Sequence, residues 1–345
     1  MRKILKIKFH SRVPEASRDC IVKQLKKWFD VCQCEDYDYY FAMETIYHDR
    51  DSMVELLESK QDAIRIMLCG EVVYPDLNLF DYAIYYFGHY KSFDRIIDSP
   101  YLYALEGSVY DSVGEIDNSK KDIDPEYILS TKSKFCNFIY SNPLAHPMRD
   151  EIFFALSKYK FIDSLGNHLK NVDIDDTRFS TGWEKISIKL KSPYKFSISV
   201  ENAYAPGYTT EKIITSMLAN SIPIYFGNPL IGEEFNEKAI INVHKYHDLS
   251  EVVDRVREID ENDQLYCEIL AEPWRNAKQI STCVQRRVMY EEALKNLFEK
   301  DVQDARRRSR GTWGDVIYPN FMSNREDNIL KKIIKRSIAS WRKLV

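Results

Sequence analysis

The sequence predicts an α/β protein of two domains that face each other across a cleft, followed by a C-terminal amphipathic helix. Short apolar strands alternate with segments of helical periodicity along most of the chain, and this alternation predicts parallel sheets covered by helices. A length of 345 residues with 44% hydrophobic residues is sufficient for two domain cores. We place the first domain at residues 1–125, the second at 126–300, and a basic tail with its helix at 301–345.

The first domain begins with alternating apolar residues that predict a strand. Further strands are predicted where short apolar runs end in polar residues, and helices where apolar residues recur every three or four positions. The strands are expected at residues 3–9, 38–43, 64–69 and 81–87, and the helices at 16–29 and 52–59. Residues 101–124 are polar and without periodicity, which indicates a loop or a linker between domains.

The second domain repeats this alternation. Strands are expected at residues 134–141, 161–163 and 239–243, and helices at 150–159, from His247 onward and over 267–298. Residues 164–171 read as a polar loop.

Residues 196–229 carry the clearest pattern of the chain. Apolar residues alternate with Ser197 and Ser199, which predicts a strand with one buried face. A helical segment and a second apolar strand follow within about thirty residues, the length of a parallel crossover unit. Such units bind phosphorylated ligands where the first strand ends and the helix begins, because free backbone amides point there. That turn contains Glu201, Asn202, Tyr204, Tyr208, Glu211 and Lys212.

Composition excludes several classes of protein. No run of eighteen apolar residues is present and the N-terminus lacks the apolar core of a signal peptide, so we expect neither a membrane span nor secretion. Seven cysteines are scattered without metal-ligand spacing, which indicates reduced thiols in the cytoplasm. Asp-x-Asp triplets occur at 36–38, 122–124 and 173–175, but acidic residues are so frequent that we expect no metal site.

The end of the chain is basic although the net charge is −4. Residues 301–345 contain eleven Lys and Arg against five Asp and Glu. On a helical projection, residues 327–345 divide into an aliphatic face with Trp341 and a basic face. This division favours a helix lying on an anionic membrane surface. The alternatives are a helix packed on the domain and, less consistent with the aliphatic face, a nucleic-acid contact.

Four blocks of the sequence, in order, resemble the α-1,3-fucosyltransferases and are closest to the bacterial members. The blocks are GEVVYPDLNLFDYAI, KFCNFIYSNPLAHPMRDEIFFALSKY, VENAYAPGYTTEKIITSMLANSIPIYFGNP and FNEKAIINVHKY. The resemblance runs from about residue 64 to residue 273. A short motif alone would be weak, whereas four in the right order are specific.

The resemblance implies a GT-B-like fold of two Rossmann-like domains, with the acceptor in the first and GDP-fucose in the second. It also implies inverting transfer of fucose, without metal or other cofactor, to O3 of N-acetylglucosamine or glucose. The acceptor would be an oligosaccharide or a glycolipid, and the enzyme would be cytoplasmic, on the inner face of the membrane. Alternatives are another GDP-deoxyhexose donor, another linkage, or an inactive glycan-binding homologue.

The resemblance also assigns the catalytic base. Glu71 matches the carboxylate that takes the proton of the acceptor hydroxyl, a role general bases fill with about 10²–10⁴-fold effect. The alternative is an ordinary surface glutamate at the end of a strand. The family often has a second acidic residue two positions later, where this chain has Val73.

The remaining matched residues fall on the donor side. Arg149 and Lys212 match cations that contact the diphosphate, and Tyr208 is expected to donate to a phosphate oxygen. Glu211 matches a carboxylate near the fucose, and Asn202 is expected to bind nucleotide or shape the turn. The alternatives are a salt bridge between Lys212 and a nearby carboxylate, and a capping role for Glu211 with a preceding threonine.

Overall fold

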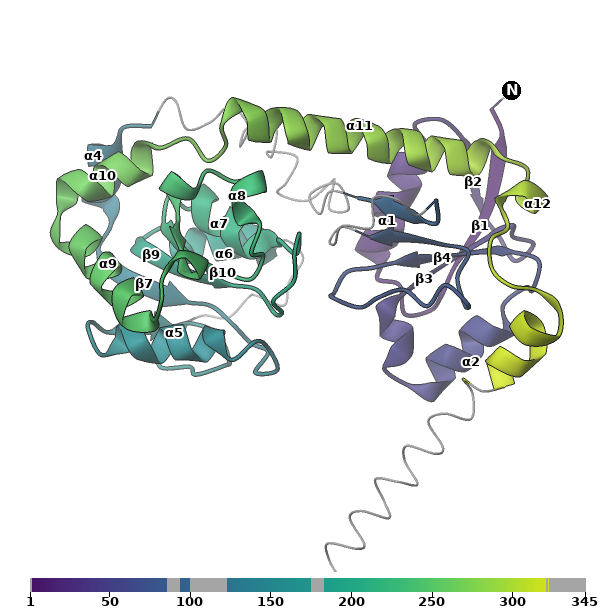
Figure 1. Ribbon diagram of the computed structural model, residues 1–345, viewed down its shortest axis with the longest axis horizontal. Helices are drawn as coiled ribbons and strands as arrows, with labels where there is room; N and C mark the ends of the chain where they lie inside the picture. Colours follow the sequence, from purple (N-terminus) through teal and green to yellow (C-terminus); the bar gives the residue numbers. More distant parts are fainter. Residues whose placement is uncertain (1, 86–93, 100–122, 175–182, 321, 323–345) are drawn as a thin grey trace, which may run out of the picture. The chain divides into compact units, whose positions relative to one another are not determined.

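The computed structural model describes residues 2–85, 94–99, 123–174, 183–320 and 322 (Figure 1). The chain divides into two compact units. The first contains the chain up to Tyr85, residues 94–99 and the chain from Met289 onward, and the second contains the rest, up to Val288. The long helix α11 (Ala277–Glu299) runs from the second unit into the first. The predicted linker at 101–124 lies almost entirely outside the described residues.

The first unit is a six-stranded parallel sheet. Its strands are β1 (Ile4–Phe9), β2 (Asp30–Gln33), β3 (Tyr39–Met43), β4 (Ile64–Leu68), β5 (Tyr82–Tyr85) and β6 (Ile96–Asp98), in the order β2-β1-β3-β4-β5-β6. The connections include α1 (Glu15–Leu25), the 3₁₀ turn η1 (Glu44–Tyr47) and α2 (Arg50–Glu58), for which Asp49 caps the N-terminus by accepting from the Ser52 amide. The strands predicted at 3–9, 38–43 and 64–69 are confirmed, as are both helices.

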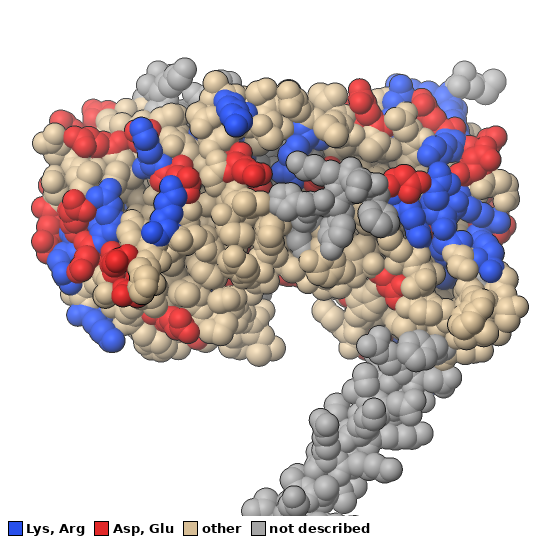
Figure 2. All heavy atoms as spheres, viewed as in Figure 1, with Lys and Arg blue, Asp and Glu red and all other residues tan. Residues whose placement is uncertain are grey.

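The segment at residues 301–310, here called the C-terminal return, is hydrogen-bonded to the first unit. After α12 (Val302–Ala305), the amides of Arg307 and Arg308 both donate to Oδ1 of the buried Asp81, at 2.9 Å each. Arg306, Arg308 and Arg310 donate to carbonyl oxygens of residues 61–63. Figure 2 shows Lys and Arg side chains gathered on this side of the unit. Part of the positive charge of the predicted basic tail is therefore used inside the fold.

The second unit is a five-stranded parallel sheet. Its strands are β7 (Lys134–Phe138), β8 (Ile162–Ser164), β9 (Tyr194–Val200), β10 (Ile222–Phe226) and β11 (Ile241–Asn242), in the order β11-β10-β9-β7-β8. The helices are α4 (Pro125–Thr131), α5 (Met148–Ser157), α6 (Trp183–Lys191), α7 (Glu211–Leu218), α8 (Ile231–Glu234), α9 (Leu249–Glu261) and α10 (Asp263–Ala271). The strand order reverses next to β7, so β7 and β9 are neighbours whose connections leave in opposite directions.

The predicted crossover at 196–229 is confirmed as β9, α7 and β10, but its strand is buried on both faces. Ser197 and Ser199 are 0% exposed, so the prediction of one solvated face is wrong. The reason is that a parallel sheet carries helices on both faces, which removes the solvated side that the alternation implied.

Four further expectations need correction or fall outside the described residues. The strand expected at 239–243 shrinks to β11 between two 3₁₀ turns, because Asn236 and Asn242 accept bonds from the amides two residues later. The helix expected at 267–298 is two helices, α10 and α11, broken where Glu272 is extended before Pro273. The last two residues of the strand expected at 81–87 and the whole helix expected at 327–345 lie outside the described residues.

Candidate active site

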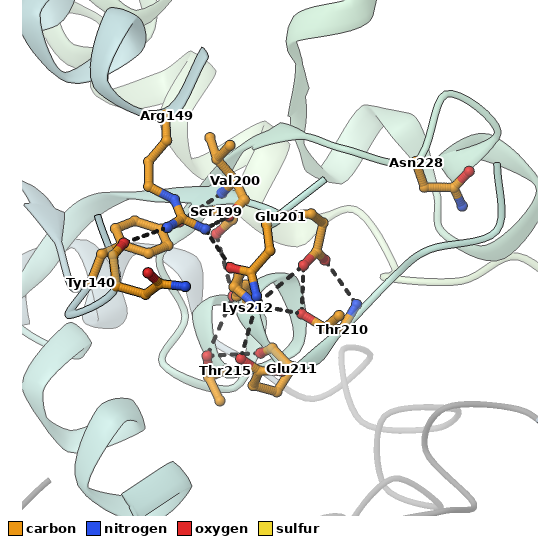
Figure 3. Close-up of polar contacts among 12 residues, drawn as sticks. Tyr140, Arg149, Ser199, Val200, Glu201, Thr210, Glu211, Lys212, Thr215 and Asn228 are labelled. Atoms are coloured by element: carbon orange, nitrogen blue, oxygen red, sulfur yellow. Dashed lines mark hydrogen bonds and ion pairs between the residues drawn. The ribbon is translucent and has the colours of Figure 1, made fainter. Parts of the chain in front are cut away.

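The candidate site lies in the second unit, where β7 and β9 end. The loop after β7 leads to α5 and the loop after β9 leads to α7, so the first turns of both helices approach the same edge of the sheet. Neighbouring strands with oppositely directed connections leave a crevice between their loops, which is where open α/β sheets bind ligands. Figure 3 shows the polar side chains gathered at this edge.

Arg149 stands in the first turn of α5 and is buried, with 1% of its surface exposed. Its guanidinium lies 4.0 Å from the ring centroid of Tyr140. The two terminal nitrogens donate to the Asn142 carbonyl at 3.2 Å, the Val200 carbonyl at 3.3 Å and Oδ1 of Asn202 at 2.7 Å. None of these acceptors is charged, and within the described residues Arg149 forms no ion pair and its Nε has no hydrogen-bond partner.

Tyr140 fixes the surface on which Arg149 rests. Its hydroxyl donates to the Ile198 carbonyl at 2.9 Å and accepts from the Val200 amide at 2.7 Å, so the ring is tied to β9 at two points. Burial raises the pKa of Tyr140 to about 12, against the opposing charge of Arg149. The residue is therefore a neutral phenol at physiological pH, and sequence reasoning did not identify it.

Lys212, the second residue of α7, lies between two carboxylates (Figure 3). Its Nζ is 3.2 Å from Oε1 of Glu211 and 3.3 Å from Oε2 of Glu201, and it donates to Oγ1 of Thr210 at 3.0 Å. Burial alone would lower the pKa of Lys212, but Glu211 and Glu201 together raise it above its ordinary value. Lys212 is thus a permanent cation, and the salt bridge that we weighed as its alternative role is present.

Glu201 is fully buried and holds the loop between β9 and α7 through two hydrogen bonds. Its two carboxylate oxygens accept from the amide of Thr210 at 2.8 Å and from its hydroxyl at 2.6 Å. Burial raises the pKa of Glu201, which Lys212 opposes. Gly227, at φ +153°, packs so closely that a Cβ there would lie 2.4 Å from the Glu201 side chain. Only glycine allows this approach.

The N-terminus of α7 has no side-chain cap. Thr210 occupies the N-cap position, but its hydroxyl donates to Glu201 and accepts from Lys212. The alternative role for Glu211 was to complete a capping arrangement with the preceding threonine. This role is not supported, because the Thr210 side chain accepts no hydrogen bond from the helix amides. A helix N-terminus without a side-chain cap is a position where the helix dipole favours an anion.

The structure brings together four of the predicted donor residues and locates the others. Asn202 holds Arg149 as described, and Glu211 has 15% of its side chain exposed. Tyr208 is 1% exposed in the loop between β9 and α7. Glu71 is exposed in the first unit, two residues beyond Cys69 at the carboxyl end of β4, and its role stays a prediction.

A buried lysine behind the site was missed. Lys191, the last residue of α6, donates to Oγ1 of Thr215 at 2.7 Å, Oγ of Ser216 at 3.0 Å and the carbonyl of Lys212 at 3.2 Å. Ser216 in turn bonds Ser197 and Ser199 of β9. The serines that alternate along β9 are thus the inner surface of a polar layer beneath α7. Burial lowers the pKa of Lys191 to about 7.

The lowered pKa of Lys191 predicts a pH-dependent stability. An unfolded lysine has a pKa of 10.5, so between about pH 7 and pH 10 the unfolded chain binds more protons than the folded one. Stability is therefore reduced below pH 7 and recovers as pH rises. From pH 7 to pH 9 the free energy of unfolding should rise by about 2 kcal/mol relative to a Lys191→Met variant.

Urea denaturation at a series of pH values measures this difference. Lys189→Met, which removes an exposed lysine from the same helix, is the matched control. Its free energy of unfolding should vary with pH in parallel with that of wild type. A Lys191→Met curve that also runs parallel to wild type would show that Lys191 is charged at neutral pH in the folded protein.

Two features are absent from the described ranges. No group of three or more His, Cys, Asp or Glu side chains there is placed to hold a metal ion. No helix there has the length and apolar character required to cross a bilayer. The seven cysteines all lie in this part of the chain, and none forms a disulfide.

Comparison with known proteins gives consistent matches. The C-terminal model of glycosyltransferase family 10 (fucosyltransferase) matches residues 129–309, more than half of the chain. The R654 protein of Acanthamoeba polyphaga mimivirus is 33% identical over 227 residues, covering 64% of this chain and 35% of R654. The α-(1,3)-fucosyltransferase FucT of Helicobacter pylori is 28% identical over 238 residues, covering 62% of this chain and 48% of FucT. The chain thus spans less than half the length of these relatives.

Solved structures share the fold. Crystal structures of an α1,3-fucosyltransferase, one without and one with GDP-fucose, superpose with TM-scores of 0.63 and 0.61. They are 22% and 21% identical and cover 84% and 85% of this chain, and 91% of each solved chain. The predicted α/β class with two Rossmann-like domains of the GT-B type is confirmed.

Proposed function

Because the chain belongs to glycosyltransferase family 10, the fucosyltransferases, we propose that it transfers fucose from GDP-fucose to a hydroxyl of a glycan acceptor. The proposed reaction is inverting, needs no metal, and makes an α-1,3 linkage to N-acetylglucosamine or glucose. The donor is the ligand named with a solved structure of the same fold. Acceptor and linkage follow from the sequence resemblance.

The observation that carries the proposal is the uncompensated charge of Arg149. A buried guanidinium without a carboxylate is unfavourable unless an anion completes the site. Lys212 and the uncapped first turn of α7 belong to the same edge of the sheet. Two fixed cations and a helix N-terminus suit a diphosphate, whose negative charge grows as the bond to fucose breaks.

The chemistry that follows divides between two carboxylates. Glu71 accepts the proton of the acceptor hydroxyl, whose oxygen attacks C1 of fucose as the bond from C1 to the phosphate oxygen breaks. Glu211, beside Lys212, faces the sugar that develops positive charge. When the diphosphate pairs with Lys212, the ion pair between Lys212 and Glu211 weakens. The Glu211 carboxylate can then interact with the fucose. Tyr208 and Asn202 complete the donor side.

Transfer assays test the proposal directly. The full chain is incubated with GDP-fucose and acceptors ending in N-acetylglucosamine, glucose or galactose, and the product linkage is determined by NMR. GDP-mannose and other GDP-deoxyhexoses serve as competing donors. We expect an α-1,3-fucosylated product from GDP-fucose. Rapid use of another GDP-sugar with none of GDP-fucose would reject fucose as the donor sugar, and no transfer from any donor would reject the enzyme.

We further propose that residues 327–345 bind the enzyme to the inner face of an anionic membrane. Their aliphatic and basic faces have the arrangement of an interfacial helix. Earlier in the chain, Trp313, Val316 and Ile317 are 69%, 51% and 42% exposed, so the sequence before the tail also offers apolar side chains.

Deletion of residues 327–345 is expected to release the protein from vesicles that contain anionic lipid while turnover of soluble substrates is unchanged. Cosedimentation with anionic and with neutral vesicles measures this. A control that replaces Lys331, Lys332, Lys335 and Arg336 by glutamine separates charge from apolar contact. It should weaken binding at low salt, and its deficit relative to wild type should shrink as salt rises, because salt screens the attraction that the cations supply. Unchanged vesicle binding after the deletion would contradict a membrane role for this segment.

A further inference from the structure

A second carboxyl group lies buried next to the segment that carries Glu71. Glu44 follows β3 directly, and β3 pairs in parallel with β4 up to Met43 and Leu68. The residues after both strands therefore meet at the carboxyl edge of the first sheet. β3 is also next to β1, where the strand order of this sheet reverses, so Glu44 stands at the edge where such sheets bind ligands.

Glu44 is hydrogen-bonded to the turn that leads from β4 to Glu71. Its Oε2 accepts from the amide of Gly70 at 2.9 Å. A Cβ on Gly70 would lie 3.0 Å from Oε1 of the same carboxylate, so the carboxylate also packs against the Gly70 backbone. Glu71 is the next residue. The direction in which the chain leaves β4 is therefore set by Glu44.

The charge of Glu44 is not neutralised within the described part of the chain. Glu44 is 7% exposed and forms no ion pair there. The titratable groups whose charges act on it are Glu71 and His48, and it acts in turn on Cys69. Burial raises the pKa of Glu44, the Gly70 amide opposes this, and the negative charge of Glu71 adds to it.

A buried carboxyl group without a cation is costly to keep for stability alone. Such groups concentrate at functional sites. Here the buried carboxylate accepts a hydrogen bond from the amide of the residue directly before Glu71.

We propose that Glu44 is a positioning residue for the general base Glu71. It holds the Gly70 amide so that Glu71, the next residue, is presented at the end of β4. This inference rests on the proposed function. In the reaction the acceptor proton goes to Glu71 and the electron pair of the breaking C1–O bond goes to GDP, while Glu44 exchanges no proton.

Two substitutions separate geometry from charge. Glu44→Gln keeps an oxygen that accepts from Gly70 and removes the charge, whereas Glu44→Ala removes both. Asp36→Asn is the matched control, because it removes one exposed carboxylate from the segment before β3, at the opposite end of the same strand. The readouts are kcat for fucose transfer, the KM for GDP-fucose, and the melting temperature.

We expect Glu44→Ala to lower kcat about 10-fold or more with an unchanged KM for GDP-fucose, because the Gly70 amide loses the acceptor that fixes the position of Glu71. Glu44→Gln keeps an acceptor for that amide, so its kcat should stay within a few-fold of wild type. Asp36→Asn should match wild type in both kcat and KM. A Glu44→Ala variant that loses only melting temperature, or a Glu44→Gln variant that loses as much kcat as Glu44→Ala, would overturn the inference. Absence of transfer by the wild-type protein would instead reject the proposed function.

Discussion

A Glu71→Gln variant is expected to lose fucose transfer by about 10²–10⁴-fold while it binds GDP as wild type does. Glutamine has nearly the shape of glutamate but cannot take the proton of the acceptor hydroxyl. The effect should appear in kcat, because Glu71 lies in the first unit and the diphosphate contacts lie in the second. Transfer kinetics together with calorimetric titration of GDP measure the two quantities separately.

The matched control for Glu71 is Glu58→Gln, which neutralises an exposed glutamate at the end of α2 in the same unit. This variant should transfer fucose at the wild-type rate. Transfer by Glu71→Gln within a few-fold of wild type would remove Glu71 as the base and leave proton abstraction to another group.

An Arg149→Met variant is expected to bind GDP about 100-fold or more weakly, because it loses the buried cation that the diphosphate would neutralise. Without GDP, its free energy of unfolding should change by only about 1 kcal/mol. The substitution removes hydrogen bonds to Asn142, Val200 and Asn202, but it also removes an uncompensated buried charge. GDP titration and urea denaturation give both values.

Arg257→Met is a close control for this result. Arg257 also stacks on a tyrosine, 5.1 Å from the ring centroid of Tyr159 in the same unit, but it is paired with Asp254 on an exposed helix. GDP binding should be unchanged in this variant. If Arg149→Met bound GDP normally and lost several kcal/mol of stability instead, Arg149 would be a structural residue.

The helices and strands were largely predictable because the spacing of apolar residues in the sequence matches the positions that are buried in the structure. The crossover at 196–229 was predicted from its apolar spacing, and the structure forms it as β9, α7 and β10. The disagreements arise where tertiary contacts override the pattern. Ser197 and Ser199 read as solvated positions, but Lys191 and Ser216 give them buried polar neighbours from helices that the pattern of β9 cannot reveal.

The positions of the candidate site residues in the fold were predictable, but the electrostatics around them were not. The motifs placed Arg149 and Lys212 at the starts of helices, where the structure has them. They could not show that Arg149 is buried against Tyr140 with uncharged partners, since these partners are Asn142 in the loop after β7, Val200 at the end of β9 and Asn202 in the loop after it. The anchoring of the C-terminal return on Asp81 joins residues more than 200 positions apart, for which no local signal exists.

The central claim is that the edge formed by β7 and β9 binds the diphosphate of the donor. A crystal structure of the full chain with GDP tests it most directly. We predict the diphosphate at the first turn of α7, with its oxygens on Lys212, on Arg149 and on the first amides of the helix. GDP bound elsewhere in the chain, or bound with Arg149 still enclosed by Tyr140 and Asn202 and both cations out of contact, would contradict the claim.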